Sequence, residues 1–362
     1  MARTPLQPIV IRFGRLGDMI MLTALLHALH ERFGSPCLLI AAGPWNAPLF
    51  QSHPDVARLL TLPRHFPAVL SGAGWQVLLA LRRRAASPVY VCEYQPRQVQ
   101  RIRRLLALGG VARARCLYIT EALPGDEDHW VDRLARFGAL TPAALQGGQY
   151  PPLAHAATPR LAVEPAERQA VRAWLAAQGA DGAPVVLVQP GNFRTLSRHR
   201  DDPARRGADD KAWPLERWVE LLAGVHRELP GAFIVLCGAP QEGALLREIA
   251  QAAALAGLAV AELPLPRLLA LCEVAHSMIS IDTGPAHAAA ALGVPLVVMF
   301  GAEAPQRWLP RSPSGSPVLA VGGPPQSSRV DQIPVAEVLG TWRGLLAAAG
   351  TRGPGTRPTE LH

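Results

Sequence analysis

Residues 280–287 read Ser-Ile-Asp-Thr-Gly-Pro-Ala-His and join an apolar run, 278–281, to an alanine-rich segment that continues to Gly293. This order predicts a buried strand, a tight turn and a helix. Asp282 or Thr283 can cap the predicted helix through a side-chain oxygen. Ligands of open α/β sheets bind at the carboxyl ends of strands, and helix N-termini favour phosphate. The turn is therefore predicted to hold a phosphorylated ligand.

The same alternation of apolar runs and helical segments recurs along the chain and predicts an α/β fold with doubly wound parallel sheets. A chain of 362 residues is too long for one ordinary core, so we expect two domains. A proline-rich stretch without periodicity near residues 150–165 marks the boundary. We expect Rossmann-like domains over residues 1–155 and 156–350, followed by a disordered tail over 351–362.

The expected elements can be placed on the sequence. The predicted strands are residues 9–12, 38–42, 55–62, 185–188, 233–237, 278–281 and 296–300. Residues 77–81 and 89–92 are interpreted as further strands or strand–helix pieces. The predicted helices are residues 19–33, 98–108, 128–137, 166–178, 215–228, 242–255, 265–272 and 335–349.

The charge balance and the cysteine pattern indicate which ligands and which cellular compartment suit this protein. The chain has 36 basic and 28 acidic residues, and Lys211 is its only lysine. Arginine suits bidentate pairing with phosphate, although a GC-rich genome also favours arginine over lysine. No zinc-finger spacing or basic-aromatic stripe is present, which argues against a nucleic-acid partner. Five scattered cysteines without C-x-x-C, no signal-peptide pattern and no apolar run of membrane-spanning length favour the cytoplasm.

A second glycine-bearing turn lies between the first predicted strand and helix. Gly14 and Gly17 permit a close backbone turn, but the spacing is not G-x-G-x-x-G, which argues against a dinucleotide-binding oxidoreductase. Asp18 ends this turn at the carboxyl end of the sheet, where a carboxylate can accept a proton from an attacking hydroxyl. An ordinary helix N-cap is the competing interpretation.

Three further residues of the C-terminal half are candidates for ligand binding. Lys211 precedes a predicted helix, where a cation suits an anionic ligand, or it is a solvated surface lysine. Glu242 follows a strand and either binds a ribose diol or interacts with the helix dipole. His287 either contacts phosphate or sugar or is a satisfied core histidine. No further ligands stand near it at metal-binding spacing, so we expect no metal.

Together these segments resemble the ADP-heptose:lipopolysaccharide heptosyltransferase family, glycosyltransferase family 9, over roughly residues 8–310. The resemblance lies in residues 11–18, residues 211–214 with Arg217 and Trp218, residues 238–242 and residues 282–287. The last segment continues into Ala-Leu-Gly-Val-Pro and then Phe300-Gly301, and it is the most specific.

The resemblance implies a GT-B fold, with two Rossmann-like domains facing across a cleft. It implies that the N-terminal domain binds the acceptor and the C-terminal domain the nucleotide sugar. The implied reaction moves heptose from ADP-heptose, with inversion, to a hydroxyl of a lipopolysaccharide inner-core acceptor, without a cofactor. By the same resemblance, Asp18 matches the general base, Lys211 a pyrophosphate contact, Glu242 a ribose contact, Asp282 a donor-sugar contact, and Thr283, Gly284 and His287 the phosphate-proximal turn.

Two departures from the family pattern leave the substrates open. The segment 192–209 is longer and more charged than the family's loop, and Cys92-Glu93-Tyr94-Gln95 stands where an acidic-Gln-Gly segment is usual. A different nucleotide sugar or acceptor is therefore an alternative, as is a non-catalytic nucleotide-sugar-binding module. The basic segments 82–84 and 97–104 either contact anionic lipid or acceptor phosphates at the inner face of the inner membrane, or form a solvated face.

Overall fold

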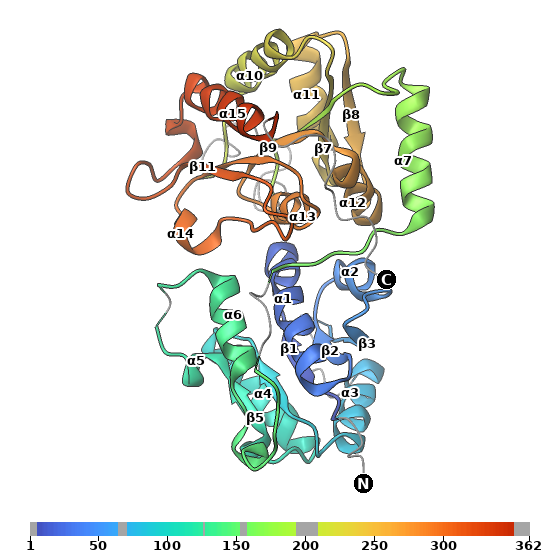
Figure 1. Ribbon diagram of the computed structural model, residues 1–362, viewed down its shortest axis with the longest axis vertical. Helices are drawn as coiled ribbons and strands as arrows, with labels where there is room; N and C mark the ends of the chain where they lie inside the picture. Colours follow the sequence, from blue (N-terminus) through green and yellow to red (C-terminus); the bar gives the residue numbers. More distant parts are fainter. Residues whose placement is uncertain (1–5, 64–70, 126, 153–157, 193–208, 351–362) are drawn as a thin grey trace. The chain divides into compact units, whose positions relative to one another are not determined.

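The computed structural model describes the chain except for residues 1–5, 64–70, 126, 153–157, 193–208 and 351–362. The predicted tail, 351–362, and most of the charged segment, 192–209, lie outside the described residues. The chain divides into two compact units, Met1–Ala162 and Val163–His362 (Figure 1). Each unit has its own sheet.

The N-terminal unit is built around a parallel sheet. Its described elements are β1 (Ile9–Arg12), α1 (Leu16–Phe33), β2 (Cys37–Ala41), α2 (Asn46–Phe50), β3 (Val56–Thr61), α3 (Gly72–Arg83), β4 (Val89–Val91), α4 (Pro96–Leu108), β5 (Cys116–Tyr118), α5 (Ile119–Ala122) and α6 (Trp130–Ala139). Within the described residues the strand order is β3-β2-β1-β4-β5, and every pairing is parallel. The order shows that the sheet is wound in both directions from β1.

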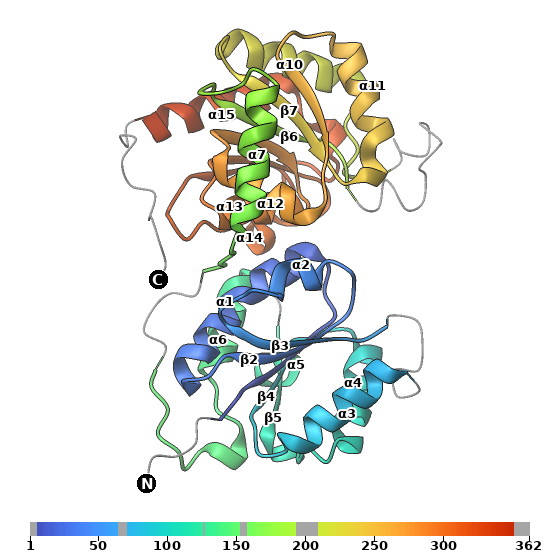
Figure 2. The same ribbon diagram turned by 90° about the vertical axis from the view of Figure 1, so that its right-hand side faces the viewer.

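Helices cover both faces of this sheet. Figure 2 shows α3 and α4 on one face and α1 and α6 on the other. Ile9 and Ile11 of β1 are fully buried against the α3 and α4 side, together with Val77 and Leu81 of α3. The helices therefore present their apolar stripes to the sheet and their polar sides away from it.

The C-terminal unit repeats this plan. Its described elements are α7 (Pro165–Ala177), β6 (Val185–Gln189), α10 (Leu215–Glu228), β7 (Phe233–Gly238), α11 (Gly243–Ala253), β8 (Leu258–Glu262), α12 (Leu265–Val274), β9 (Ser277–Ile281), α13 (Gly284–Ala291), β10 (Leu296–Phe300), α14 (Pro305–Trp308), β11 (Val318–Gly322) and α15 (Val335–Gly350). The described strands form one parallel sheet in the order β11-β10-β9-β6-β7-β8.

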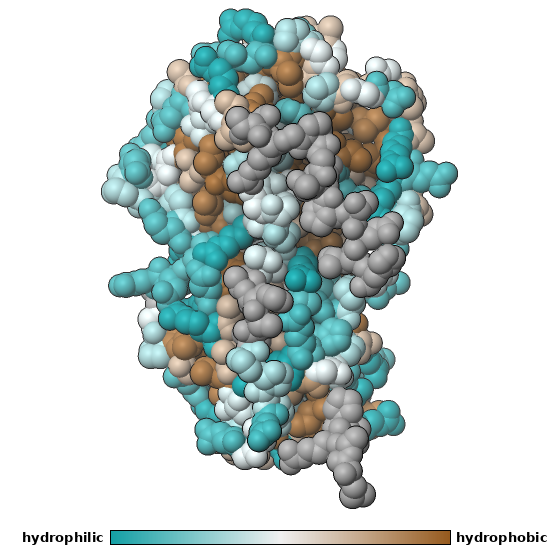
Figure 3. Space-filling view, viewed as in Figure 1, coloured by the Kyte–Doolittle hydropathy of each residue, from teal (hydrophilic) through white to brown (hydrophobic). Residues whose placement is uncertain are grey.

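The second core lies between this sheet and the helices α10, α11 and α15. Trp218 and Trp342, from α10 and α15, are almost completely buried there against Val188 and Ile279. The other face is covered by α7, α12 and α13. In Figure 3 hydrophilic side chains cover much of the visible surface of both units, and hydrophobic ones show in separate patches. Most of the large apolar residues are buried, and few are exposed.

Most predicted elements are confirmed, and several need correction. Residues 77–81 lie inside α3 and are not a strand. Their buried positions, Val77, Leu78 and Leu81, have the spacing of a helix. The prediction was wrong because a short apolar run is compatible with either a strand or a buried helix segment. Helix α1 begins at Leu16, three residues earlier than predicted. The sequence analysis did not predict β5, β8 or β11, which are short or largely lack buried residues.

None of the helices in the described part of the chain combines the length and the apolar character that crossing a membrane requires.

Candidate active site

Each sheet has a point at which the winding direction reverses. In the C-terminal unit the chain passes from β6 to β7 and β8 on one side, and then to β9 on the other side of β6. Ligands of open α/β sheets commonly bind at such a reversal point. The loop after β9 begins at Asp282, and the loop after β6 contains Gly191. The predicted phosphate-binding turn therefore lies at the reversal point of its sheet.

Lys211 and Asp282 form an ion pair at this point. The Lys211 Nζ lies 2.5 Å from Oδ2 of Asp282 and donates a second hydrogen bond, of 2.8 Å, to the Asp282 carbonyl oxygen. The two side chains are only 13% and 9% exposed. The structure therefore brings together two residues that the sequence analysis assigned separately to the donor.

Asp210, the residue before Lys211, is hydrogen-bonded to the loop after β10 and to Val330. Asp210 accepts hydrogen bonds from the backbone N–H groups of Ala302, at 3.0 Å, and Val330, at 2.7 Å. A Cβ at Gly301 would lie 2.6 Å from the Asp210 carbonyl oxygen, so glycine is required for this approach. The backbone N–H of Lys211 is itself bound by Asp209 Oδ1 at 2.9 Å. These contacts hold the lysine in place ahead of α10.

The turn before α13 differs from the expected side-chain cap. Thr283 occupies the N-cap position but makes no capping hydrogen bond, and the Asp282 carboxylate is engaged by Lys211. Among the described residues, the backbone N–H groups of Thr283 and Gly284 have no hydrogen-bond partner. His287, on the first turn of α13, is 6% exposed. The start of α13 thus presents backbone donors next to the ion pair.

Glu242 lies at the end of the short 3-10 helix Pro240–Glu242 that follows β7. Its carboxylate accepts a hydrogen bond of 2.6 Å from the Ala239 N–H and lies 3.4 Å from the Gln189 side-chain nitrogen. Burial raises the pKa of Glu242 to about 7, against the opposing effect of these two hydrogen bonds. A Cβ on Gly191 would lie 2.1 Å from Oε1. The loop after β6 therefore closes directly over this carboxylate.

In the N-terminal unit the winding reverses between β1 and β4, and Asp18 stands at the end of β1. Its Oδ1 accepts a hydrogen bond of 2.8 Å from Arg12, and Oδ2 accepts one of 2.8 Å from the Arg15 N–H. Asp18 is thus the third residue of α1 and not its N-cap. A Cβ on Gly14 would lie 2.5 Å from the Asp18 Cβ, and Gly17 lies in the first turn of α1.

Arg12 organises the surroundings of Asp18 and was not identified from sequence. It is 2% exposed and donates to the Cys92 carbonyl oxygen at 2.8 Å. Its guanidinium lies 4.8 Å from the ring centre of Tyr94 and 5.3 Å from that of Trp130. The signal was present, because Arg12 is a charged residue at the end of an apolar strand and Tyr94 follows the neighbouring strand.

Glu93 completes this group. Its Oε1 accepts a hydrogen bond of 2.5 Å from the Phe13 N–H, and its Oε2 lies 3.7 Å from Arg12. Burial raises the pKa of Glu93, and the nearby Asp18 adds to the increase, while Arg12 and the Phe13 hydrogen bond oppose it. The segment in which the chain departs from the family pattern therefore lies against the ion pair of Asp18.

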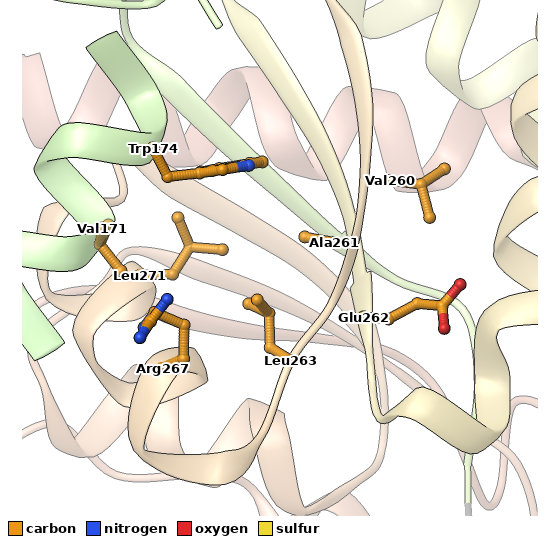
Figure 4. A pocket seen from close by; sticks show the side chains of 8 residues that line it. All are labelled: Val171, Trp174, Val260, Ala261, Glu262, Leu263, Arg267 and Leu271. Atoms are coloured by element: carbon orange, nitrogen blue, oxygen red, sulfur yellow. The ribbon is translucent and has the colours of Figure 1, made fainter. Parts of the chain in front are cut away.

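A separate cavity of about 210 Å³ lies in the C-terminal unit between α7, β8 and α12 (Figure 4). Trp174, Leu263 and Leu271 line it, with Arg267 at its side. It contains none of the predicted site residues, and its lining is largely apolar. Asp18, Lys211 and Asp282 lie instead at the reversal points of their own sheets, which are the candidate site. Among the described residues, no group of three or more His, Cys, Asp or Glu side chains is arranged to bind a metal ion.

Comparison with known proteins finds a family match for part of the chain. Residues 202–333, which carry Lys211, Glu242 and Asp282–His287, match the family model described as glycosyltransferase family 9 (heptosyltransferase). This part of the chain, about a third of its length, is similar to glycosyltransferase family 9. No curated protein matches the chain in sequence.

Solved structures resemble this chain over nearly its whole length. Escherichia coli ADP-heptose lps heptosyltransferase II is 18% identical with a TM-score of 0.67, covering 95% of this chain and 99% of that chain. A glycosyl transferase family 9 protein from Veillonella parvula is 14% identical with a TM-score of 0.69, covering 96% and 99%. Escherichia coli heptosyltransferase WaaC with ADP is 17% identical with a TM-score of 0.63, covering 94% and 99%. The fold, two parallel-sheet units of GT-B type, is confirmed.

Proposed function

We propose that this protein is a family 9 glycosyltransferase that transfers heptose from ADP-heptose, with inversion, to a hydroxyl of a lipopolysaccharide inner-core acceptor. The observation that carries the proposal is the Lys211–Asp282 ion pair at the reversal point between β6 and β9, beside the start of α13. The solved structures of WaaC with ADP and with ADP-2-deoxy-2-fluoro heptose, each under 20% identical, support the choice of donor class.

The donor pyrophosphate is proposed to lie against the start of α13. The Lys211 ammonium and the N–H groups of Thr283 and Gly284 would stabilise the negative charge that develops on the departing ADP. Because Lys211 is paired with Asp282 in this structure, the pyrophosphate would share or replace that partner. The Asp282 carboxylate would then be able to accept hydrogen bonds from hydroxyls of the donor sugar. His287 is proposed to complete this phosphate-proximal turn.

Glu242 is proposed to bind the ribose hydroxyls of the donor. Its position at the end of β7, next to Gly191 of the adjacent loop, supports this assignment. A carboxylate accepts hydrogen bonds from both hydroxyls of a diol only when it is ionised. Since burial raises the pKa of Glu242 to about 7, ribose binding and ionisation would be coupled near neutral pH.

Asp18 is proposed as the general base on the acceptor. The acceptor oxygen would form a bond to the anomeric carbon while the bond from that carbon to the phosphate oxygen breaks, and the hydroxyl proton would pass to Asp18. The hydrogen bonds from Arg12 and the Arg15 N–H fix the direction of the carboxylate and leave it 15% exposed. The N-terminal unit is accordingly assigned to the acceptor and the C-terminal unit to the donor. The chemistry uses protein groups alone and requires no cofactor.

The proposed acceptor is a membrane glycolipid, so the enzyme would work in the cytoplasm at the inner face of the inner membrane. Another nucleotide sugar or acceptor on the same fold is the alternative that the departures at residues 92–95 and 192–209 favour. A non-catalytic nucleotide-sugar-binding module is the second alternative.

Release of nucleoside diphosphate from a panel of nucleotide sugars, with defined lipopolysaccharide-core fragments as acceptors, tests the proposal. We expect acceptor-dependent release of ADP from ADP-heptose and much slower release from UDP- or GDP-sugars. Preference for another donor would replace ADP-heptose but retain a transferase. Tight binding of ADP-heptose without ADP release, with any acceptor, would support the binding module.

A further inference from the structure

The positive charge of this chain is concentrated in one segment. Residues 56–120 contain eleven arginines and one acidic residue, Glu93. The remainder has 25 basic and 27 acidic residues, so its net charge is −2 while that of the whole chain is +8. Glu93 is buried beside Arg12 and cannot screen surface arginines. The segment includes both α3 and α4.

Helix α3 exposes apolar and basic side chains along one stripe. Trp75, Leu79, Arg82 and Arg83 are all exposed and stand at positions i, i+4, i+7 and i+8, which share one face of a helix. Trp75 is 62% exposed and Leu79 50%, which makes them the most exposed large apolar residues of α3. The stripe is therefore an amphiphilic surface of the kind that soluble helices usually avoid.

Helix α4 carries a matching stripe. Arg97, Arg101, Arg104 and Leu108 are exposed at positions i, i+4, i+7 and i+11, and Leu108 is 55% exposed. In the described part of the chain none of these three arginines, nor Arg82 or Arg83, forms an ion pair. The stripe thus has uncompensated positive charge along its length.

The two stripes form one surface. Both helices pack their apolar sides on the same face of the N-terminal sheet, as Figure 2 shows. They also meet at their ends, since a Cβ on Gly109 would lie 2.7 Å from the Leu81 Cβ. Their exposed stripes consequently face away from the sheet on the same side. We call this surface the α3–α4 face; it comprises Trp75, Leu79, Arg82, Arg83, Arg97, Arg101, Arg104 and Leu108.

Neighbouring arginines at the end of α3 repel one another. The pKa of Arg84 is lowered, first by burial and then by the charges of Arg58 and Arg83. Repulsion of this kind is relieved when anions bind across the cluster.

We propose that the α3–α4 face docks on the surface of an anionic lipid bilayer. Arginines pair well with lipid phosphates, and a tryptophan with aliphatic neighbours partitions into the headgroup region. An RNA partner fits less well, because Leu79 and Leu108 have no ring to stack on a base. The proposal deepens the membrane-side location of the proposed function, but it uses no step of the transfer reaction. Its test contains no nucleotide, so either proposal can fail without the other.

Cosedimentation of the full chain with vesicles tests this surface. We compare vesicles of equal parts phosphatidylglycerol and phosphatidylcholine with vesicles of phosphatidylcholine alone. The expected result is binding to the anionic vesicles that weakens as salt rises. The double substitution Arg101→Glu with Arg104→Glu should weaken binding more than about tenfold. Trp75→Ser with Leu79→Ser should weaken the binding that remains at high salt.

Matched controls separate the surface from net charge. Arg172 and Arg227 are exposed arginines of the C-terminal unit, and changing both to Glu alters the net charge equally. We expect this control, and Leu319→Ser for the apolar pair, to bind like the wild type. The proposal is overturned if the wild type does not bind anionic vesicles. It is also overturned if the control charge reversal weakens binding as much as Arg101→Glu with Arg104→Glu does, or if a short RNA displaces the protein from vesicles.

Discussion

The ammonium of Lys211 and the carboxylate of Asp282 lie 2.5 Å apart although the two residues are 71 positions apart in the chain. Lys211 precedes α10, and Asp282 directly follows β9. Because both side chains are largely buried, the pair ties the loop after β6 to the turn before α13.

Removal of Lys211 should affect transfer more than folding. We expect Lys211→Ala to lower kcat/KM for sugar transfer by about 10²- to 10³-fold, because one donor to the leaving group is lost. Lys211→Arg should retain part of the activity, since the charge is kept. Steady-state kinetics with ADP release measure both. Unchanged kinetics in Lys211→Ala would remove the lysine from the site.

The Lys211–Asp282 ion pair should contribute measurably to the free energy of unfolding. Removing one partner of a largely buried pair leaves the other charge uncompensated, so Lys211→Ala or Asp282→Asn should each lower the free energy of unfolding by about 3 kcal/mol at most. The double substitution should cost less than the sum of the single ones. Urea unfolding provides the values. Additive losses would mean that the two residues do not interact in solution.

Donor affinity should rise with pH near neutrality. The folded pKa of Glu242 is raised to about 7 by burial, so the carboxylate is mainly protonated at pH 6 and mainly ionised at pH 8. If the ionised form binds ribose, ADP affinity increases by up to about tenfold over this range. The same shift predicts that Glu242 contributes stability at low pH, which is lost as pH rises from about 4.5 to about 7.

The control for this pH dependence is Glu242→Gln, which keeps the shape and removes the titration. Calorimetric titration with ADP should then give nearly the same affinity at pH 6 and pH 8. A wild-type profile as flat as that of the variant would show that ribose binding does not depend on this carboxylate.

Loss of the Asp18 carboxylate should abolish turnover without affecting the donor. Asp18→Asn should reduce kcat by about 10²- to 10⁴-fold, the contribution expected of a general base, and leave ADP affinity unchanged. Glu31→Gln, an exposed carboxylate on the same helix, is the matched control and should remain fully active. Full activity in Asp18→Asn would require another base.

Acid should destabilise the N-terminal unit through Asp55. Its carboxylate receives hydrogen bonds from His30, at 2.7 Å, and His27, at 3.2 Å, and its N–H is bound by His53. Burial alone would raise the pKa of Asp55, but the hydrogen bonds and charges of the histidines outweigh it, and the pKa is lowered.

A depressed carboxyl pKa stabilises the fold above the unfolded value, about 3.9, and this stabilisation is lost as pH falls through the folded value. Asp55→Asn should therefore lower the free energy of unfolding by about 1–3 kcal/mol at neutral pH and by less below pH 3. Urea unfolding at several pH values measures this. Asp181→Asn, an exposed carboxylate, should show no such difference.

The cysteines should be unreactive in the native protein. All five are free and buried, and burial raises the pKa of Cys116 to about 11 and that of Cys272 to about 12. The thiolate is the reactive form, so a thiol-specific reagent should modify none of them quickly until denaturant is added. Rapid modification of one thiol in the native state would reveal local opening at that cysteine.

Most helices and strands could be predicted from the sequence, because local patterns of apolar and turn-forming residues specify them. Helix α10 begins and ends where predicted, since Pro214 precedes it and an apolar stripe runs through it. The order of the strands in the sheet could not be predicted. For example, β6 pairs with β9, and Val188 lies opposite Ile279, about 90 positions away in the chain. Local periodicity does not indicate which distant strands pair.

Position relative to strand ends made Asp18, Glu242 and the turn at Asp282 candidates, since ligands gather there in α/β sheets. Position alone left their roles open, and the proposed roles came from the family resemblance. The Lys211–Asp282 pair could not be predicted, because the two residues are 71 positions apart and no local pattern links them. Arg12 was missed although it is a charged residue at the end of an apolar strand, because its partners, Asp18 and the Cys92 carbonyl, come from separate segments.

The two hydrophobic cores determine what a melting curve of this protein will report. One is formed by residues of the N-terminal unit alone and the other by residues of the C-terminal unit alone. Two such cores need not melt together, so a single midpoint temperature would not describe the chain. A nucleotide that binds beside Lys211 stabilises the core it contacts, and would separate the two midpoints by raising only one.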